Sequence, residues 1–279
     1  MERIEVRQWF GIAFIVIDLS TRSAVGWVGD MTTHTYNNAF MQYAARSSSY
    51  SATAIASMLR SKLRFASVLD IGCATGRWLR AWSEAGITDL HGVDGEYIDR
   101  QQLELPELMF TAVNLNRAFD LGRQFDLVQS LEVGEHIEES ASDIFSECLV
   151  RHARCYILFS AAPPGQGGEY HINEQPYEFW RQKFEQRGFA ALDAVRPAII
   201  DDTKISYWYR YNTLLFIRRD LLPEIGRHLQ NKILSGDEQI RDLSPFPFRV
   251  RKTLVRMLPN VVQHKIASLK AKLLPTGRI

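Results

Sequence analysis

Apolar runs of strand length alternate along the middle of the chain with segments whose apolar residues recur at helical spacing. This alternation predicts βαβ crossovers and a parallel sheet with helices on both faces. Two later runs predict an antiparallel pair that closes the sheet. The first five candidate strands are ASVLDIG (66–72), DLHGVD (89–94), LMFTAVN (108–114), FDLVQSL (125–131) and CYILFSAA (155–162), and the two later ones are GFAALDAVRP (188–197) and SYWYRYNTLLFIRRD (206–220).

The chain divides into three segments. SSYSATAIASMLRSKL (48–63) has the small and apolar spacing of a helix that leads into the first strand, so we expect a doubly wound α/β domain over residues 45–217. Residues 1–44 form an expected N-terminal arm. Its stretch WFGIAFIVI (9–17) is too short to span a bilayer, which leaves an extra strand, a packing arm or an upstream translated extension. Residues 218–279 form an expected helical extension.

The extension is strongly basic, although the whole chain has a net charge of only +1. Residues 218–279 carry 13 Lys/Arg against 5 Asp/Glu, whereas residues 1–217 carry 20 against 27. No acidic residue follows Asp242, and apolar residues recur at roughly helical spacing between the basic ones. Two interpretations stay open: a peripheral contact with an anionic membrane or polyanion, and packed helices with a solvated basic face. The apolar positions are Val250, Leu254, Val255, Leu258, Ile266, Leu269 and Leu273.

Composition places the protein among ordinary soluble chains, with 46% hydrophobic and 23% charged residues over 279 positions. The three cysteines, Cys73, Cys148 and Cys155, are odd in number and lack metal-type spacing. This cysteine usage favours a reducing compartment over a disulfide framework, so we expect a cytoplasmic protein. The sequence leaves its oligomeric state open.

The stretch SVLDIGCATGRW (67–78) predicts a ligand site, because a strand with an acid at its end turns through small residues into a helix. A dinucleotide fingerprint G-x-G-x-x-G would need glycines at 72, 74 and 77, where the chain has Gly72, Ala74 and Arg77. Asp70 would also meet a pyrophosphate with like charge. These two observations oppose a dinucleotide oxidoreductase and favour a cationic ligand.

VLDIGCATG (68–76) resembles the first motif of the class I S-adenosylmethionine-dependent methyltransferases. The resemblance implies a Rossmann-like, doubly wound, seven-stranded sheet that is mostly parallel with one antiparallel strand, and S-adenosylmethionine as cofactor. Ala74 departs from the family's middle glycine, and we expect alanine to be tolerated where φ stays negative. The expected cofactor residues of this turn are Asp70, Gly72, Cys73 and Gly76, with Cys73 as a small buried filler.

Later motifs extend the resemblance over residues 45–217. GVDGE places Asp94 where the family's acid accepts hydrogen bonds from both ribose hydroxyls, and AVNLN places Asn114 and Leu115 beside the adenine. FDLVQSLEVGEHIEE (125–139) resembles the fourth-strand motif of small-molecule and sugar methyltransferases. ILFSAAPPGQGGEYHINEQPYEFW (157–180) resembles their fifth strand and its loop.

Polar side chains crowd the loops after the fourth and fifth strands, where the acceptor is expected. Methylation of a hydroxyl needs a group that takes its proton or lowers its pKa. We expect His171 to be the general base, with His136 second and Glu132 as a further catalytic candidate. The full set of polar candidates in these loops is Glu132, Glu135, His136, His171, Asn173 and Glu174.

Two interpretations of this group of polar residues stay open. Glu132, Glu135, His136 and His171 resemble the metal-binding set of small-RNA 2′-O-methyltransferases, which implies a divalent ion such as Mg²⁺ or Mn²⁺. In the alternative, the acid-rich turn starts a helix and the histidines pack or hydrogen-bond locally. The nearby aromatic residues also have two uses, as walls of the acceptor pocket or as core: Tyr207, Trp208, Tyr209 and Tyr211.

The expected function is O-methylation of a hydroxyl on a small metabolite or a glycan-type acceptor. The alternatives are N-methylation, methylation of a nucleic acid, and a noncatalytic adenosylmethionine-binding module. A nucleic-acid substrate would use the basic extension, but the acidic body offers no basic groove. A noncatalytic module is opposed by the polar residues at 132–136 and 171–175.

Overall fold

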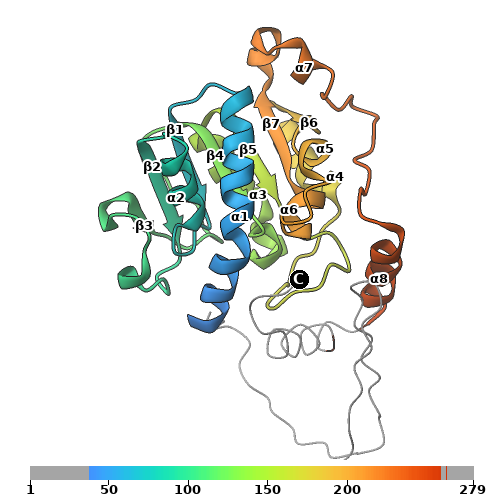
Figure 1. Ribbon diagram of the computed structural model, residues 1–279, viewed down its shortest axis with the longest axis horizontal. Helices are drawn as coiled ribbons and strands as arrows, with labels where there is room; N and C mark the ends of the chain where they lie inside the picture. Colours follow the sequence, from blue (N-terminus) through green and yellow to red (C-terminus); the bar gives the residue numbers. More distant parts are fainter. Residues whose placement is uncertain (1–37, 259–261, 263–279) are drawn as a thin grey trace, which may run out of the picture.

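The computed structural model describes residues 38–258 and residue 262. One seven-stranded sheet has the order β3-β2-β1-β4-β5-β7-β6, with helices on both faces (Figure 1). Strand β7 alone runs in reverse and pairs antiparallel with both β5 and β6, so the predicted fold class is confirmed. The strands are β1 Ser67–Ile71, β2 Asp89–Asp94, β3 Phe110–Ala112, β4 Phe125–Leu131, β5 Ala153–Ser160, β6 Phe189–Leu192 and β7 Leu214–Arg218.

The helices connect the strands as the βαβ pattern predicts. The α-helices are α1 Asn38–Lys62, α2 Arg77–Glu84, α3 Ser142–His152, α4 Tyr177–Gln186, α5 Arg196–Ile199, α6 Tyr207–Asn212, α7 Arg227–Gln230 and α8 Phe246–Arg256. Short 3-10 helices are η1 Arg100–Gln102, η2 Glu107–Met109, η3 Gly134–His136, η4 Glu139–Ala141 and η5 Arg219–Glu224. Successive side chains of strand β1 point to opposite faces of the sheet. Val68 packs in the core with α1 and α2, and Leu69 packs in the core with α3 and α4.

The prediction of a strand over residues 206–220 is wrong in its first half, because Tyr207–Asn212 forms helix α6. The run YWYRY is aromatic at almost every position and therefore carries neither a strand period nor a helix period. Tertiary contacts decide the conformation: Tyr209 is buried, and its ring lies edge-on to that of Trp78 at 5.1 Å. The helical turn brings the chain back to the sheet, and only Leu214–Arg218 forms a strand.

The segment after β7 closes the open edge of the sheet. Leu192 of the edge strand β6 forms a bridge with Ile233, and the Leu234 amide donates to the Ala191 carbonyl at 2.9 Å. This pairing covers backbone groups that an exposed edge would offer to other chains.

Two buried arginines hold the same segment by its carbonyl groups. Arg181 on α4 donates to the carbonyl oxygens of Leu234 (3.2 Å), Ser235 (2.7 Å) and Glu238. Arg196 donates to the Arg241 carbonyl at 2.9 Å and is fully buried. Residues 234–241 are therefore part of the packed structure of the domain.

No helix among the described residues is long and apolar enough to cross a bilayer. The apolar stretch at 9–17 and the predicted apolar positions Ile266, Leu269 and Leu273 lie outside the described residues. The three cysteines are unpaired thiols.

Candidate functional site

The turn between β1 and α2 is built around two glycines with positive φ. Gly72 has a φ of +85°, and a β-carbon there would lie 2.4 Å from a methyl carbon of Val133, so no side chain fits. Gly76 has a φ of +88° and starts α2. The amides of Gly72 and Cys73 donate to the Val93 carbonyl at 2.8 and 3.2 Å, which fixes the turn beside the end of β2.

Asp70 is buried beneath this turn, with 3% of its surface exposed. Among the described residues, its Oδ2 atom has no hydrogen-bond partner. Burial raises the pKa of its carboxyl to about 7. A buried carboxylate oxygen that lacks a donor suits a cationic group, so the structure fits the expectation from the sequence.

Asp94 ends β2 and ties three parts of the turn together. Its Oδ2 accepts a hydrogen bond from the Ala74 amide at 2.7 Å, and its Oδ1 accepts from the Gly95 amide at 2.7 Å and from the Tyr97 hydroxyl. Burial raises the pKa of this carboxyl as well. Each carboxylate oxygen has two lone pairs, which leaves acceptor capacity for a ligand hydroxyl.

The condition under which alanine is expected to be tolerated, a negative φ, is not met, because the φ of Ala74 is 49°. In this left-handed conformation the Ala74 amide donates to Asp94 Oδ2, and glycine would adopt the same conformation without steric cost. For alanine this conformation costs about 1–2 kcal/mol.

We expect Ala74→Gly to raise the free energy of unfolding by up to about 1 kcal/mol. Glycine removes the strain in the folded state, but it also increases the conformational entropy of the unfolded chain, which offsets part of the stabilisation. The melting temperature should rise by about 2–4 °C for each kcal/mol. The matched control is Ala85→Gly, since Ala85 has a φ of −80° and gains nothing from glycine. A melting temperature that falls in Ala74→Gly would contradict the strain.

Asn114 and Leu115 lie on the turn after β3, as predicted, but their environments differ. Asn114 is exposed, and its Oδ1 accepts the Asn116 amide at 2.9 Å, so its side chain stabilises the turn. Leu115 is buried against the core that contains α3 and α4. The backbone places both residues one strand away from Asp94, through the β2–β3 pairing.

Glu135, His136 and His171 form one cluster after β4, with one potential ligand atom from each within 4.8 Å of the others. The amides of Ile172 and Asn173 donate to the Glu135 carbonyl at 2.9 and 3.0 Å, which joins the two loops. The two imidazole rings lie 5.0 Å apart and nearly perpendicular, and His136 Nδ1 lies 3.1 Å from the Tyr170 carbonyl oxygen.

The electrostatics of this cluster centre on Glu135, which is fully buried. Neither carboxyl oxygen has a hydrogen-bond partner among the described residues, and His171 Nε2 lies 3.9 Å from Oε1. Burial, followed by the charge of Glu132, raises the pKa of Glu135 well above its usual value. A buried carboxyl without donors is costly, so this position requires a proton, a donor or a cation.

Glu174 orients His171 from the other side. Its Oε1 lies 2.8 Å from His171 Nδ1 and also accepts the Gly167 amide at 2.7 Å, while Oε2 accepts the Gly165 amide at 2.7 Å. The carboxylate thus fixes the imidazole ring and the glycine-rich loop together. Nε2 of His171 is left facing Glu135.

The sequence predicts that Glu132 belongs to this cluster, but in the structure its carboxylate has other partners. Its Oε1 accepts Asn212 Nδ2 at 3.1 Å, and its Oε2 accepts Gln166 Nε2 at 2.8 Å. Its φ of 56° is a strained conformation for glutamate, and burial raises its pKa. Asn212 and Gln166 come from distant segments and carry no motif, so the sequence does not identify them as partners of Glu132.

The aromatic residues of α6 contact different parts of the molecule. Tyr209 belongs to the core, whereas the ring of Tyr207 lies 4.8 Å from that of Phe248 on α8. The Tyr211 ring is 6.0 Å from the same phenylalanine. Helix α8 therefore packs against α6, a contact that the sequence did not indicate.

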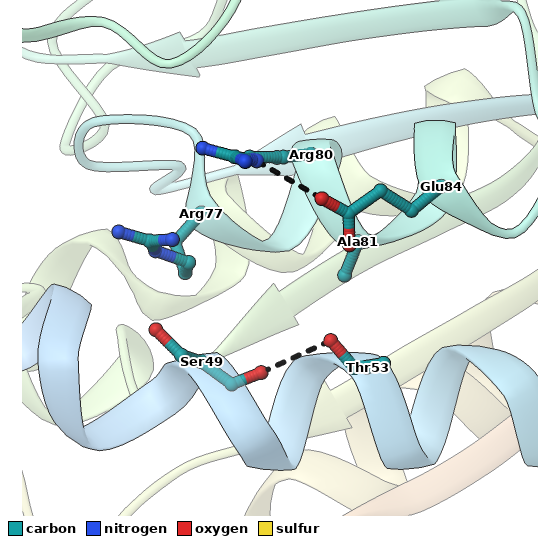
Figure 2. Close-up of a pocket in the computed structure, with 6 residues that line it drawn as sticks. All are labelled: Ser49, Thr53, Arg77, Arg80, Ala81 and Glu84. Carbon is teal, nitrogen blue, oxygen red and sulfur yellow. Dashed lines mark hydrogen bonds and ion pairs between the residues drawn. The ribbon is translucent and has the colours of Figure 1, made fainter.

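A small pocket of about 70 Å³ lies away from these groups, between α1 and α2 (Figure 2). Arg80 pairs there with Glu84 at 3.0 Å, and Arg77 pairs with Glu104 at 2.8 Å. The cations at this pocket are already neutralised, so we assign it no role. Its lining residues are Ser49, Thr53, Arg77, Arg80, Ala81 and Glu84.

Comparison with known proteins agrees with the arrangement of the turn and the sheet. A family model described as a methyltransferase domain matches residues 39–154. No curated protein sequence matches the chain. Among solved structures, the sugar N-methyltransferase KedS8 from a Streptoalloteichus species matches over 71% of this chain and 100% of its own, with 16% identity and a TM-score of 0.51.

Two further structures were solved with bound S-adenosylmethionine. CalS10, an amino pentose methyltransferase from Micromonospora echinaspora, matches over 68% of this chain and 100% of its own, with 14% identity and a TM-score of 0.46. Magnesium protoporphyrin IX methyltransferase from Synechocystis matches over 67% and 86%, with 16% identity and a TM-score of 0.45.

Proposed function

We propose that this chain is a class I S-adenosylmethionine-dependent methyltransferase and that it methylates a hydroxyl oxygen of a small metabolite or a glycan-type acceptor. The unpaired thiols are consistent with a reducing, cytoplasmic location, which is part of the proposal. The name of KedS8, a sugar N-methyltransferase, supports a sugar acceptor, although the atom methylated by that protein is nitrogen.

The β1–α2 turn and Asp94 form the proposed cofactor side of the site. When bound, the cofactor supplies a methyl group that its sulfonium centre already activates. Asp70 would attract the positive charge of the donor, and Asp94 Oδ2 would accept a hydrogen bond from a ribose hydroxyl. Gly72 keeps the backbone turn free of side-chain atoms. Asn114 and Leu115 would lie on the adenine side.

The observation that carries the oxygen acceptor is the cluster of Glu135, His136 and His171 on the loops after β4 and β5. We infer that His171 Nε2 takes the hydroxyl proton, because Glu174 holds Nδ1 and leaves Nε2 facing the cluster. His136 stands 5.0 Å away, ring to ring, as a second proton acceptor. An amine acceptor would also need a base, so it is the second candidate.

A divalent ion such as Mg²⁺ or Mn²⁺ is a further part of the proposal. The residues fit it in one respect, since the buried Glu135 carboxyl lacks donors and faces two imidazoles. These three residues would hold the ion, and Glu132 would contribute only if it released Asn212 and Gln166. Such an ion would lower the pKa of an acceptor hydroxyl.

Chelation tests the metal directly. If an ion is used, excess EDTA should abolish methyl transfer to hydroxyl acceptors, and added Mg²⁺ or Mn²⁺ should restore it, because the alkoxide would lose its stabilising charge. Production of S-adenosylhomocysteine is the measurement, and calorimetric cofactor binding in EDTA is the control. Full turnover in EDTA would rule out a role for a metal ion, and His171 would then be the proposed base without one.

The acceptor class is tested by offering matched sugars that differ only in a hydroxyl or an amino group. Turnover of the hydroxylated set supports the proposal. Turnover confined to the amino set would replace it with N-methylation, the activity named for KedS8.

A further inference from the structure

Among the described residues, the contacts of helix α8 with the rest of the molecule come from one face. Its inner face contacts the loop after β5, where Arg251 Nη1 donates to the Gln166 carbonyl at 3.1 Å. The space where a Gly165 side chain would stand is filled by the Lys252 carbonyl oxygen, 2.1 Å from an ideal β-carbon. Lys252 also pairs with Asp242, and Phe248 packs on Tyr207.

The outer face of α8 is apolar and exposed. Phe246 is 70% exposed, Val250 41%, Leu254 54% and Met257 78%. The spacings of four, four and three residues place these four side chains on one side of an α-helix, with Met257 at its C-cap. We call these four residues the outer apolar stripe. A contiguous exposed apolar stripe of this kind is typical of a surface that contacts a protein partner, a ligand or a membrane.

Basic side chains flank the outer apolar stripe. Arg249 and Arg256 are exposed and lie along one edge of the stripe at helical geometry. No acidic residue follows Asp242 anywhere in the sequence, and residues 259–279 add Lys265, Lys270, Lys272 and Arg278.

We propose that the outer apolar stripe of α8 binds the surface of an anionic lipid bilayer. An amphipathic helix with a basic edge inserts its apolar side chains at the boundary of headgroups and acyl chains, while its cations meet the lipid phosphates. A second copy of the chain fits less well, because a symmetric contact would bring the arginines of both copies together. A nucleic acid would use the arginines and leave the apolar stripe in water.

Vesicle sedimentation with the full chain tests the proposal. We expect the protein to sediment with phosphatidylcholine vesicles that contain phosphatidylglycerol, to bind pure phosphatidylcholine more weakly, and to dissociate as salt screens the charges. Leu254→Glu should weaken partitioning about tenfold or more, because it removes a leucine that would insert into the bilayer and adds a carboxylate that the anionic lipids repel. Arg249→Gln and Arg256→Gln should each weaken it about fivefold.

The matched control is Leu108→Glu, the same change at an 82% exposed leucine on η2, which should leave partitioning unchanged. Circular dichroism checks that each variant remains folded. Failure of the wild-type chain to bind phosphatidylglycerol vesicles at low salt would overturn the proposal. So would equal losses in Leu254→Glu and Leu108→Glu. Light scattering supplies another contrary outcome: a dimer that Leu254→Glu converts to a monomer, without any vesicle binding. RNA binding that needs the arginines, again without vesicle binding, would also overturn it.

Discussion

Replacing His171 by glutamine is expected to lower the turnover of a hydroxylated acceptor by about 10²–10⁴-fold, the usual contribution of a general base. Glutamine retains a polar side chain of similar size but cannot take a proton. Cofactor affinity should stay within a few-fold of wild type, because His171 contacts Glu174 and faces Glu135 rather than the β1–α2 turn. Single-turnover kinetics and calorimetric cofactor binding give the two measurements.

His228→Gln is the matched control, since His228 is exposed on α7, outside the site. It should retain wild-type turnover. A His171→Gln enzyme that keeps more than about a tenth of wild-type activity would fall outside the range of a general base, and it would move the role to His136 or to another group.

Replacing Asp94 by alanine is expected to weaken cofactor binding by about 10–10²-fold, because one hydrogen bond from a ribose hydroxyl to a charged acceptor would be lost. Calorimetric titration with S-adenosylhomocysteine measures the effect. The same change also removes the acceptor for the amides of Ala74 and Gly95, so the melting temperature must be followed alongside.

Two controls separate these roles of Asp94. Glu96→Ala removes an exposed carboxylate two residues away and should leave binding intact. Tyr97→Phe removes the hydrogen bond that the Tyr97 hydroxyl donates to Asp94 and should change binding less than Asp94→Ala. If Asp94→Ala stays folded and binds the product within about threefold of wild type, the ribose assignment is wrong, since even one lost hydrogen bond to a charge costs more.

The sheet and the β1–α2 turn could be predicted because both depend on local sequence. The bounds of β2 and β4 coincide with the apolar runs DLHGVD and FDLVQSL. The acid and glycines of the β1–α2 turn are close in sequence, so their spacing carries the motif. Where local pattern is ambiguous, as over Tyr207–Asn212, packing against Trp78 decides the outcome and the prediction fails.

The acceptor side was predicted only in part. Placing Glu135, His136 and His171 together follows from two adjacent parallel strands, whose carboxyl ends meet at one edge. The partners of Glu132 could not be found, because Asn212 and Gln166 approach it from 80 and 34 residues away. The strain at Ala74 depends on a backbone angle that alanine does not encode.

Arg181 and Arg196 make the last quarter of the chain hard to remove. A gene fragment that stops after β7 would keep the ion pairs of Arg181 with Glu185 and of Arg196 with Asp193, but both guanidinium groups would lose their carbonyl acceptors at residues 234–241. Each lost hydrogen bond to a charged group costs about 1.5–3 kcal/mol. The combined loss is a large share of the stability of a typical domain. Truncation would therefore yield aggregated product in expression trials, and crystallographers seeking a minimal catalytic fragment should retain at least Asp242.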